Sequence, residues 1–187
     1  IIGTDSKKAN NILKSLYLPI IKKTNRYFNT SRRSAELIKY ASNAFLATKI
    51  TFINELANLS EKTGVDIKDI SLGMGSDQRI GDRFLRAGPA YGGSCFPKDT
   101  RALINIGAKF KTDLSIVKSV VTSNHKRKIL LTKKVETILN GNLKGKKVSF
   151  LGVTFKPNTD DMREASSIPM INYLNKKKCK VKYFDPS

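Results

Sequence analysis

Apolar residues recur at intervals of three and four positions along most of the chain, a spacing that is typical of amphipathic helices. The clearest run extends from Ser34 to Thr63 and ends before Gly64, a residue type that often terminates helices. At about 1.5 Å per residue this helix would be about 45 Å long, which is more than one small domain needs. It would therefore join two domains or serve in dimerisation. Its recurring positions are Leu37, Ala41, Ala44, Phe45, Thr48, Phe52, Leu56 and Leu59.

Shorter elements are predicted on either side of this long helix. Residues 1–3 read as the end of a strand, and residues 4–6 can cap a helix that ends near Leu18, with Pro19 beyond its end. Three further helices are predicted at residues 66–73, 97–108 and 113–139, and a glycine-punctuated loop over residues 74–96 separates the first two.

The pattern changes toward the C-terminus, where residues 147–152 read as a buried strand, 165–175 as a helix and 181–184 as a second strand. Strand, helix, strand is the opening unit of a parallel α/β sheet. We therefore expect an α/β chain in which a central all-helical domain with a long spine helix precedes the start of a Rossmann-like parallel domain. The predicted domains are residues 1–33, 34–143 and 144–187.

The chain is strongly basic, with 187 residues and a net charge of +20. Lysine and arginine neutralise phosphates, so nucleic-acid binding is one explanation of this charge. The lysines are spread along the whole chain, however, and no recognition helix, zinc finger or stacking-aromatic pattern accompanies them. We therefore expect no nucleic-acid partner, since a general bias toward lysine or an anionic small substrate explains the charge equally well.

The cysteine and histidine contents point away from several classes of protein. Cys95 and Cys179 lie far apart without metal-ligand spacing, so we expect a reducing, cytoplasmic location and no disulfide framework. His125 is the only histidine, which leaves a metal site or a Ser-His-Asp triad without support. No apolar run approaches the roughly 18 residues that a membrane span needs, so we expect no membrane partner.

The most informative stretch runs from Gly92 to Asp99 and reads GGSCFPKD. Cys95 follows two glycines and precedes a proline that is well suited to the first position of a helix. The positive end of a helix dipole and the neighbouring Lys98 both favour a thiolate there, and the glycines leave room for close approach of a substrate. This layout is expected of a cysteine nucleophile; a buried structural cysteine is the alternative.

Two further positions are candidates for the same chemistry. Lys39 and Asn43 are four residues apart on the long helix, so they face the same way and can offer a positive charge and an amide donor to an oxyanion. Two solvated residues are the alternative. Asp99 lies one helical turn after Cys95 and can orient a water or pair with a lysine. An ordinary aspartate at a helix start is the alternative there.

Other loops carry weaker signals. Arg79 has no obvious packing role and can reach a phosphate or a neighbouring subunit, although a surface arginine is the simpler interpretation. The segment 84–89 is either an extended, substrate-binding backbone or an ordinary turn. Residues 152–157 follow a strand with a glycine, as phosphate-binding loops do, yet no Gly-x-Gly-x-x-Gly fingerprint occurs in the chain.

Four motifs, in this order along the chain, resemble the UDP-glucose/GDP-mannose dehydrogenase family, and the resemblance extends over essentially all of the chain. It implies NAD-dependent, four-electron oxidation of UDP-glucose to UDP-glucuronate, in which Cys95 forms a thiohemiacetal and then a thioester that water releases as the acid. It also implies a homodimer or higher oligomer that buries the long helix between subunits. The motifs are residues 34–39, 77–81, 92–99 and 155–164.

The resemblance also implies roles for individual residues. Cys95, Lys39, Asn43 and Asp99 would be catalytic, with Lys39 and Asn43 stabilising oxyanions and Asp99 positioning water or holding Lys39. Arg79 would reach the substrate of a neighbouring subunit, and Lys98 and Arg163 would contact NAD. The remaining substrate contacts would be Phe84, Leu85, Arg86, Ala87, Gly88, Gly92 and Lys156.

Departures from the family pattern leave alternatives open. The chain starts without Met inside a strand and ends after one βαβ unit, so we expect a fragment that lacks most of the NAD-binding domain and is inactive alone. Ala90 stands where glycine is usual. The alternatives are a dehydrogenase for GDP-mannose or a UDP-amino sugar, a non-catalytic remnant that dimerises through its long helix, and a basic nucleic-acid binder.

Overall fold

The computed structural model describes residues 1–21 and 26–186, which divide into two compact units, residues 1–42 and 43–187. The first unit pairs β1 (Ile2–Gly3) in parallel with β2 (Asn29–Thr30) and contains α1 (Lys7–Ile21). The prediction that α1 ends before Pro19 is wrong, since Pro19 lies inside the helix. Pro19 lies close to the C-terminal end of α1, so little of the helix follows the one backbone donor that it removes.

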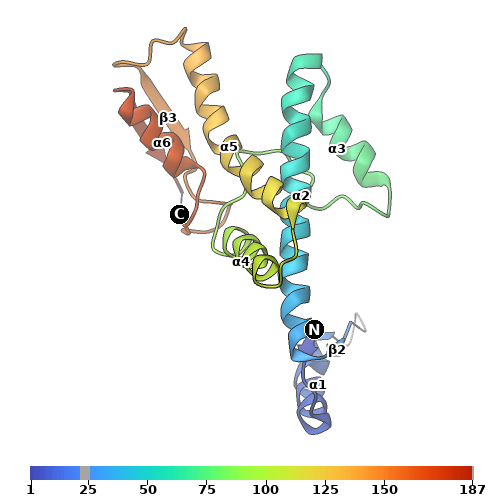
Figure 1. Cartoon of the computed structure of the whole chain (residues 1–187). Coiled ribbons are helices and arrows are strands. Elements are labelled where there is room, and N and C mark those ends of the chain that lie inside the picture. Colours follow the sequence, from blue (N-terminus) through green and yellow to red (C-terminus); the bar gives the residue numbers. More distant parts are fainter. Residues whose placement is uncertain (22–25, 187) are drawn as a thin grey trace. The chain divides into compact units, whose positions relative to one another are not determined.

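The second unit is mainly helical and is shown in Figure 1. The unit boundary falls within α2 (Arg32–Thr63), which ends before Gly64 at a φ of +74°. The remaining helices are α3 (Ile67–Ser76), α4 (Phe96–Lys109), α5 (Ser115–Ile138) and α6 (Ser167–Lys176). The predicted helices are therefore all present, and α3 extends three residues farther into the glycine-punctuated loop than expected.

The C-terminal part of this unit is a parallel βαβ unit. β3 (Lys147–Leu151) pairs with β4 (Lys180–Phe184), and α6 connects them. Leu143, Leu174 and Cys179 form a small core beneath the pair. The predicted α/β fold class, in which a helical part precedes a parallel βαβ unit, is confirmed. The prediction that β3 is a buried strand is wrong. Within the described residues the sheet has two strands, so the side chains of β3 are exposed or half-buried.

Helix α2 buries mainly small and polar side chains together with Ile53, and it exposes several large apolar ones. In the second unit its buried positions include Asn43, Ala47 and Asn54, whereas Phe45, Phe52 and Leu59 are exposed. Phe45, Phe52 and Leu59 are spaced seven residues apart and therefore share one face of the helix. We call these three residues the α2 apolar stripe. Within the described residues, no helix is long and apolar enough to cross a membrane.

Candidate active site

Cys95 lies at the start of α4, where its side chain is exposed. It is the N-cap residue, and Pro97 occupies the first turn as the sequence predicts. The backbone N–H of Asp99 donates to the Cys95 carbonyl at 2.8 Å, which closes the first turn of the helix. Ser94 Oγ lies 3.7 Å from Cys95 Sγ. The sulfur is therefore accessible at the positive end of a helix dipole, which rules out a buried structural cysteine.

Asp99 is a buried carboxylate one turn below the sulfur, and only 2% of its surface is exposed. Asn43 Nδ2 donates to Asp99 Oδ2 at 2.5 Å, and Lys98 Nζ lies 2.8 Å from Asp99 Oδ1. Asn43 is itself buried, so it is not the solvated residue that its spacing alone allowed. Lys39 belongs to the first unit, where its side chain is exposed. The amide of Asn43 is thus fixed by a charged acceptor.

The two glycines before Cys95 make room for another part of the chain. Gly93 has a φ of +77° and its N–H donates to the Arg163 carbonyl at 2.8 Å. A Cβ on Gly92 would lie 2.4 Å from the Glu164 carbonyl oxygen, and a Cβ on Gly93 would lie 2.6 Å from the Phe155 ring. The expectation that the glycines leave open space for a substrate is therefore wrong here, because the loop over residues 155–164 fills that space.

This packing brings the loop that carries Lys156 and Arg163, two residues predicted to contact ligands, to the turn that carries Cys95. Arg163 is exposed and binds Asp161 through two hydrogen bonds of 2.9 and 2.8 Å. The Asp161 carboxylate, and to a smaller degree the charge of Cys95, raise the pKa of Arg163. Lys156 extends over the Phe155 ring, with its ammonium 5.3 Å from the ring centroid. The hydrogen bond from the Gly93 N–H to the Arg163 carbonyl places the backbone of Arg163 against the turn that carries Cys95.

The predicted substrate loop is anchored by residues that the sequence analysis did not single out. The Gly88 N–H donates to Asn54 Oδ1 at 2.7 Å, and Arg127 Nε donates to the Gly88 carbonyl at 3.0 Å. Farther along, the side-chain amide of Asn124 exchanges two hydrogen bonds with the Tyr91 backbone, at 2.8 and 3.0 Å. α2 and α5 therefore determine the path of the loop.

The side chains of this loop diverge. Leu85 is buried and its carbonyl accepts a 2.5 Å hydrogen bond from Ser71 Oγ, whereas Phe84 is exposed and lies 6.1 Å from the Phe96 ring. Arg86 and Ala87 line a pocket of about 680 Å³ against α3. Arg79 pairs with Asp77, at 2.6 Å between Nη2 and Oδ2, and its side chain is exposed.

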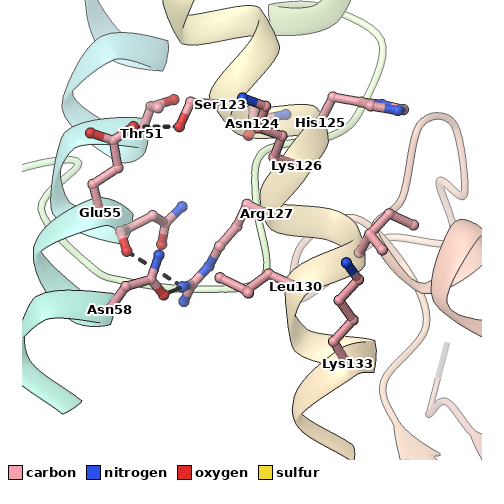
Figure 2. Close-up of a pocket in the computed structure, with 12 residues that line it drawn as sticks. Thr51, Glu55, Asn58, Ser123, Asn124, His125, Lys126, Arg127, Leu130 and Lys133 are labelled. Atoms are coloured by element: carbon pink, nitrogen blue, oxygen red, sulfur yellow. Dashed lines mark hydrogen bonds between the residues drawn. The ribbon is translucent and has the colours of Figure 1, made fainter. Parts of the chain in front are cut away.

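Figure 2 shows a pocket of about 520 Å³ between α2 and α5. Arg127 crosses it and donates to Asn58 Oδ1, while Ser123 Oγ donates to Glu55. Burial lowers the pKa of Arg127, so its hydrogen bonds are needed to keep the buried charge. Cys95 is not among the residues that line this pocket. The pocket is therefore separate from the cysteine, and two of its lining residues, Asn124 and Arg127, hold the loop that leads to Cys95.

The sequence gives only a weak indication of the residues that anchor this loop. Asn54, Asn124 and Arg127 are polar residues on helix faces that turn inward. A polar residue on an amphipathic helix is ordinarily assigned to solvent. Only the contacts with the loop reveal why these side chains are buried.

Comparison with known protein families identifies two parts of the chain. The model for the central domain of the UDP-glucose/GDP-mannose dehydrogenase family matches residues 33–126, and the model for the UDP binding domain of the same family matches residues 149–187. Cys95, all of α2 but its first residue and the predicted substrate loop fall in the first match. The second match contains the loop that packs against the Gly92–Gly93 turn.

Individual relatives agree with this result. The chain is 48% identical over 186 residues to the UDP-glucose 6-dehydrogenases of Rickettsia typhi and Bacillus subtilis, and it spans 43% and 41% of their lengths. A UDP-glucose dehydrogenase structure from Pyrobaculum islandicum matches all of the chain and 42% of its own, with a TM-score of 0.90 and 38% identity. A UDP-D-ManNAc dehydrogenase structure from Pyrococcus horikoshii matches 99% of this chain and 44% of its own, with a TM-score of 0.84 and 25% identity.

Ala90 carries backbone strain that a glycine would relieve. Its φ is +117°, a conformation that side chains with a Cβ rarely adopt. We expect Ala90→Gly to raise the free energy of unfolding by about 1 kcal/mol, measured by urea denaturation. Ala87→Gly is the control, since Ala87 has an ordinary φ, and it should lower stability by about 0.5 kcal/mol. Equal losses in both variants would show that Ala90 is not strained.

Proposed function

The chain belongs to the UDP-glucose/GDP-mannose dehydrogenase family, and from that premise we propose that it carries the nucleophile-bearing part of an NAD-dependent UDP-glucose 6-dehydrogenase. The reaction is the four-electron oxidation of UDP-glucose to UDP-glucuronate. The observation that carries this proposal is the exposed Cys95 at the start of α4, above a buried Asp99 that binds Asn43.

Cys95 is proposed to act on the aldehyde level of the substrate. Its sulfur adds to the C6 carbonyl carbon and gives a thiohemiacetal, whose oxidation leaves a thioester. Water then attacks the thioester carbon, which releases the acid and returns the thiol. Each addition creates an oxyanion, and donors placed where that charge develops accelerate such steps. The family resemblance assigns this purpose to the amide N–H of Asn43 and the positive charge of Lys39.

Asp99 is proposed to act by holding Asn43. Both of its carboxylate oxygens are engaged, one by Asn43 and the other by Lys98. Because the pair of Asn43 and Asp99 is buried, the amide cannot rotate freely toward solvent. Asp99 is thereby better suited to fix the orientation of a donor than to abstract a proton. The alternative role, in which Asp99 holds Lys39, is supported by the sequence resemblance alone.

The cofactor is proposed to be NAD, which accepts a hydride in each of the two oxidations. Lys98 and Arg163 fit such a group, since both side chains are exposed cations close in sequence or in space to the Cys95 turn. Charged donors of this kind suit the phosphates of a dinucleotide. Arg163 is held by Asp161 through two hydrogen bonds, so its guanidinium is oriented before a ligand arrives.

The substrate is proposed to lie along residues 84–92, with Lys156 as a contact from the following domain. The family model for residues 149–187 is named for UDP binding, which supports a nucleotide sugar as the ligand. Arg79 is proposed to reach the substrate of a second subunit. The likeness to a UDP-D-ManNAc dehydrogenase favours one alternative, a UDP-amino sugar as the substrate.

The proposed ligand is tested by isothermal titration calorimetry of the full chain. We expect UDP-glucose to bind in preference to UDP-N-acetylglucosamine and GDP-mannose. Lys39→Ala should weaken that binding about tenfold or more, because it removes a charge from the site. Lys62→Ala is the matched control, since Lys62 is another exposed lysine of α2. A preference for the amino sugar would favour the alternative substrate, and equal binding of all three sugars would contradict both.

The proposed oligomer is tested through the α2 apolar stripe. Phe45, Phe52 and Leu59 expose about half or more of their surface, and a dimer that buries them removes apolar area from water. We expect Phe52→Glu to shift the chain from dimer to monomer in sedimentation velocity. Phe110→Glu, an exposed phenylalanine at the end of α4, should leave the dimer intact. A wild-type chain that is already monomeric would overturn this assignment.

A further inference from the structure

Glu164 is bound by cations from two different helices. Arg101 of α4 donates from Nη1 and Nη2 to Glu164 Oε1, both at 3.2 Å. Lys128 of α5 donates from Nζ to the Glu164 carbonyl at 2.9 Å and lies 3.5 Å from Oε2. The backbone of Glu164 has a φ of +54°, which a residue with a side chain keeps only when its surroundings require it. Through Glu164, α4 and α5 therefore both hold the loop over residues 155–164.

Lys128 differs from Arg101 in its burial. Its side chain is 8% exposed, against 55% for Arg101. A buried ammonium without acceptors is costly, and the acceptors of Lys128 are two oxygens of one residue, Glu164. Burial opposes ionisation of Glu164, yet Lys128 and Arg101 together outweigh it, so the pKa of the Glu164 carboxyl lies below its ordinary value. The Glu164 carboxylate, although partly exposed, is thus held as an anion by the two cations.

The contacts that hold Glu164 also affect the turn that carries Cys95, because the residue next to Glu164, Arg163, binds that turn. The Arg163 carbonyl accepts the Gly93 N–H at 2.8 Å, two residues before Cys95. The Glu164 carbonyl also lies where a Cβ on Gly92 would be, so the two backbones are in close contact. A shift of Glu164 therefore shifts Arg163 relative to Cys95.

We propose that Lys128 is a positioning residue that, by binding Glu164, holds Arg163 against the Gly92–Gly93 turn, from where its cation acts on the Cys95 sulfur. The inference deepens the proposed function and rests on it, since it gives Cys95 a fixed cationic neighbour during its chemistry. It also explains why one lysine of a strongly basic chain is buried on α5 while most others lie in solvent. A cation held at this place favours anionic over neutral partners at the sulfur.

The test compares two alkylating reagents of similar size on the full chain. Iodoacetate is anionic and iodoacetamide is neutral, so the ratio of their rate constants reports the local charge and cancels changes in exposure of the thiol. The rates are followed by mass spectrometry of the peptide that contains Cys95. We expect Lys128→Met to lower the iodoacetate-to-iodoacetamide ratio about threefold. Lys128→Arg, which keeps a cation that can reach Glu164, should preserve the ratio.

Two comparisons separate positioning from other effects. Arg163→Gln should lower the ratio as much as Lys128→Met, and the double variant should show no further fall, because both changes remove the same cation from the sulfur. Lys134→Met is the matched control: Lys134 lies on α5 like Lys128, its ion pair is with Glu61 of α2, and its loss should leave the ratio unchanged. Circular dichroism confirms that each variant is folded, and Lys128→Gln replaces Lys128→Met if the latter is not.

An unchanged ratio in the folded Lys128 variant would overturn the proposal, as would a double variant whose effects simply add. The second result would mean that Lys128 acts on the sulfur by its own charge and does not position Arg163. Calorimetry with UDP-glucose tests the proposed function separately, so a chain that binds no nucleotide sugar but shows the expected ratios would refute the function and leave the positioning role intact.

Discussion

The contact between the Gly92–Gly93 turn and the loop over residues 155–164 is the constraint on which the candidate site depends. The Gly93 N–H binds the Arg163 carbonyl, and the Glu164 carbonyl and the Phe155 ring occupy the space that side chains at Gly92 and Gly93 would need. A residue with a Cβ at either position would force the two segments apart. The same contact brings a cysteine from the helical part of the chain together with cations from the βαβ part.

Buried polar side chains, more than a large apolar core, keep these segments in place. Asn54, Asn124 and Arg127 fix the loop over residues 84–91, and Lys128 fixes Glu164. Buried polar groups are costly when unpaired, so each of these bonds favours one arrangement of the backbone. The α2 apolar stripe of Phe45, Phe52 and Leu59 is exposed, which agrees with the proposal that a second subunit covers it.

The sequence predicted the elements well because helical periodicity and the order of strands are local properties. It placed Cys95 at a helix start and Asp99 one turn later, and both positions are confirmed. It failed where the outcome depends on distant contacts. β3 is not buried, and the glycines face another loop. Burial of Asn43 and Lys128 was not predictable either, because their partners lie 56 and 36 residues away.

The central claim is that Cys95 is the nucleophile toward a nucleotide-sugar aldehyde. Carbon NMR of UDP-glucose 6-aldehyde labelled at C6 tests it directly, because addition of the sulfur converts the carbonyl carbon into a thiohemiacetal carbon with its own resonance. We expect this resonance with the full chain and with Cys179→Ser, which removes a sulfur buried against Leu143 and Leu174, and we expect none with Cys95→Ser. A resonance that persists in folded Cys95→Ser, or one that never appears although the aldehyde binds, would contradict the account.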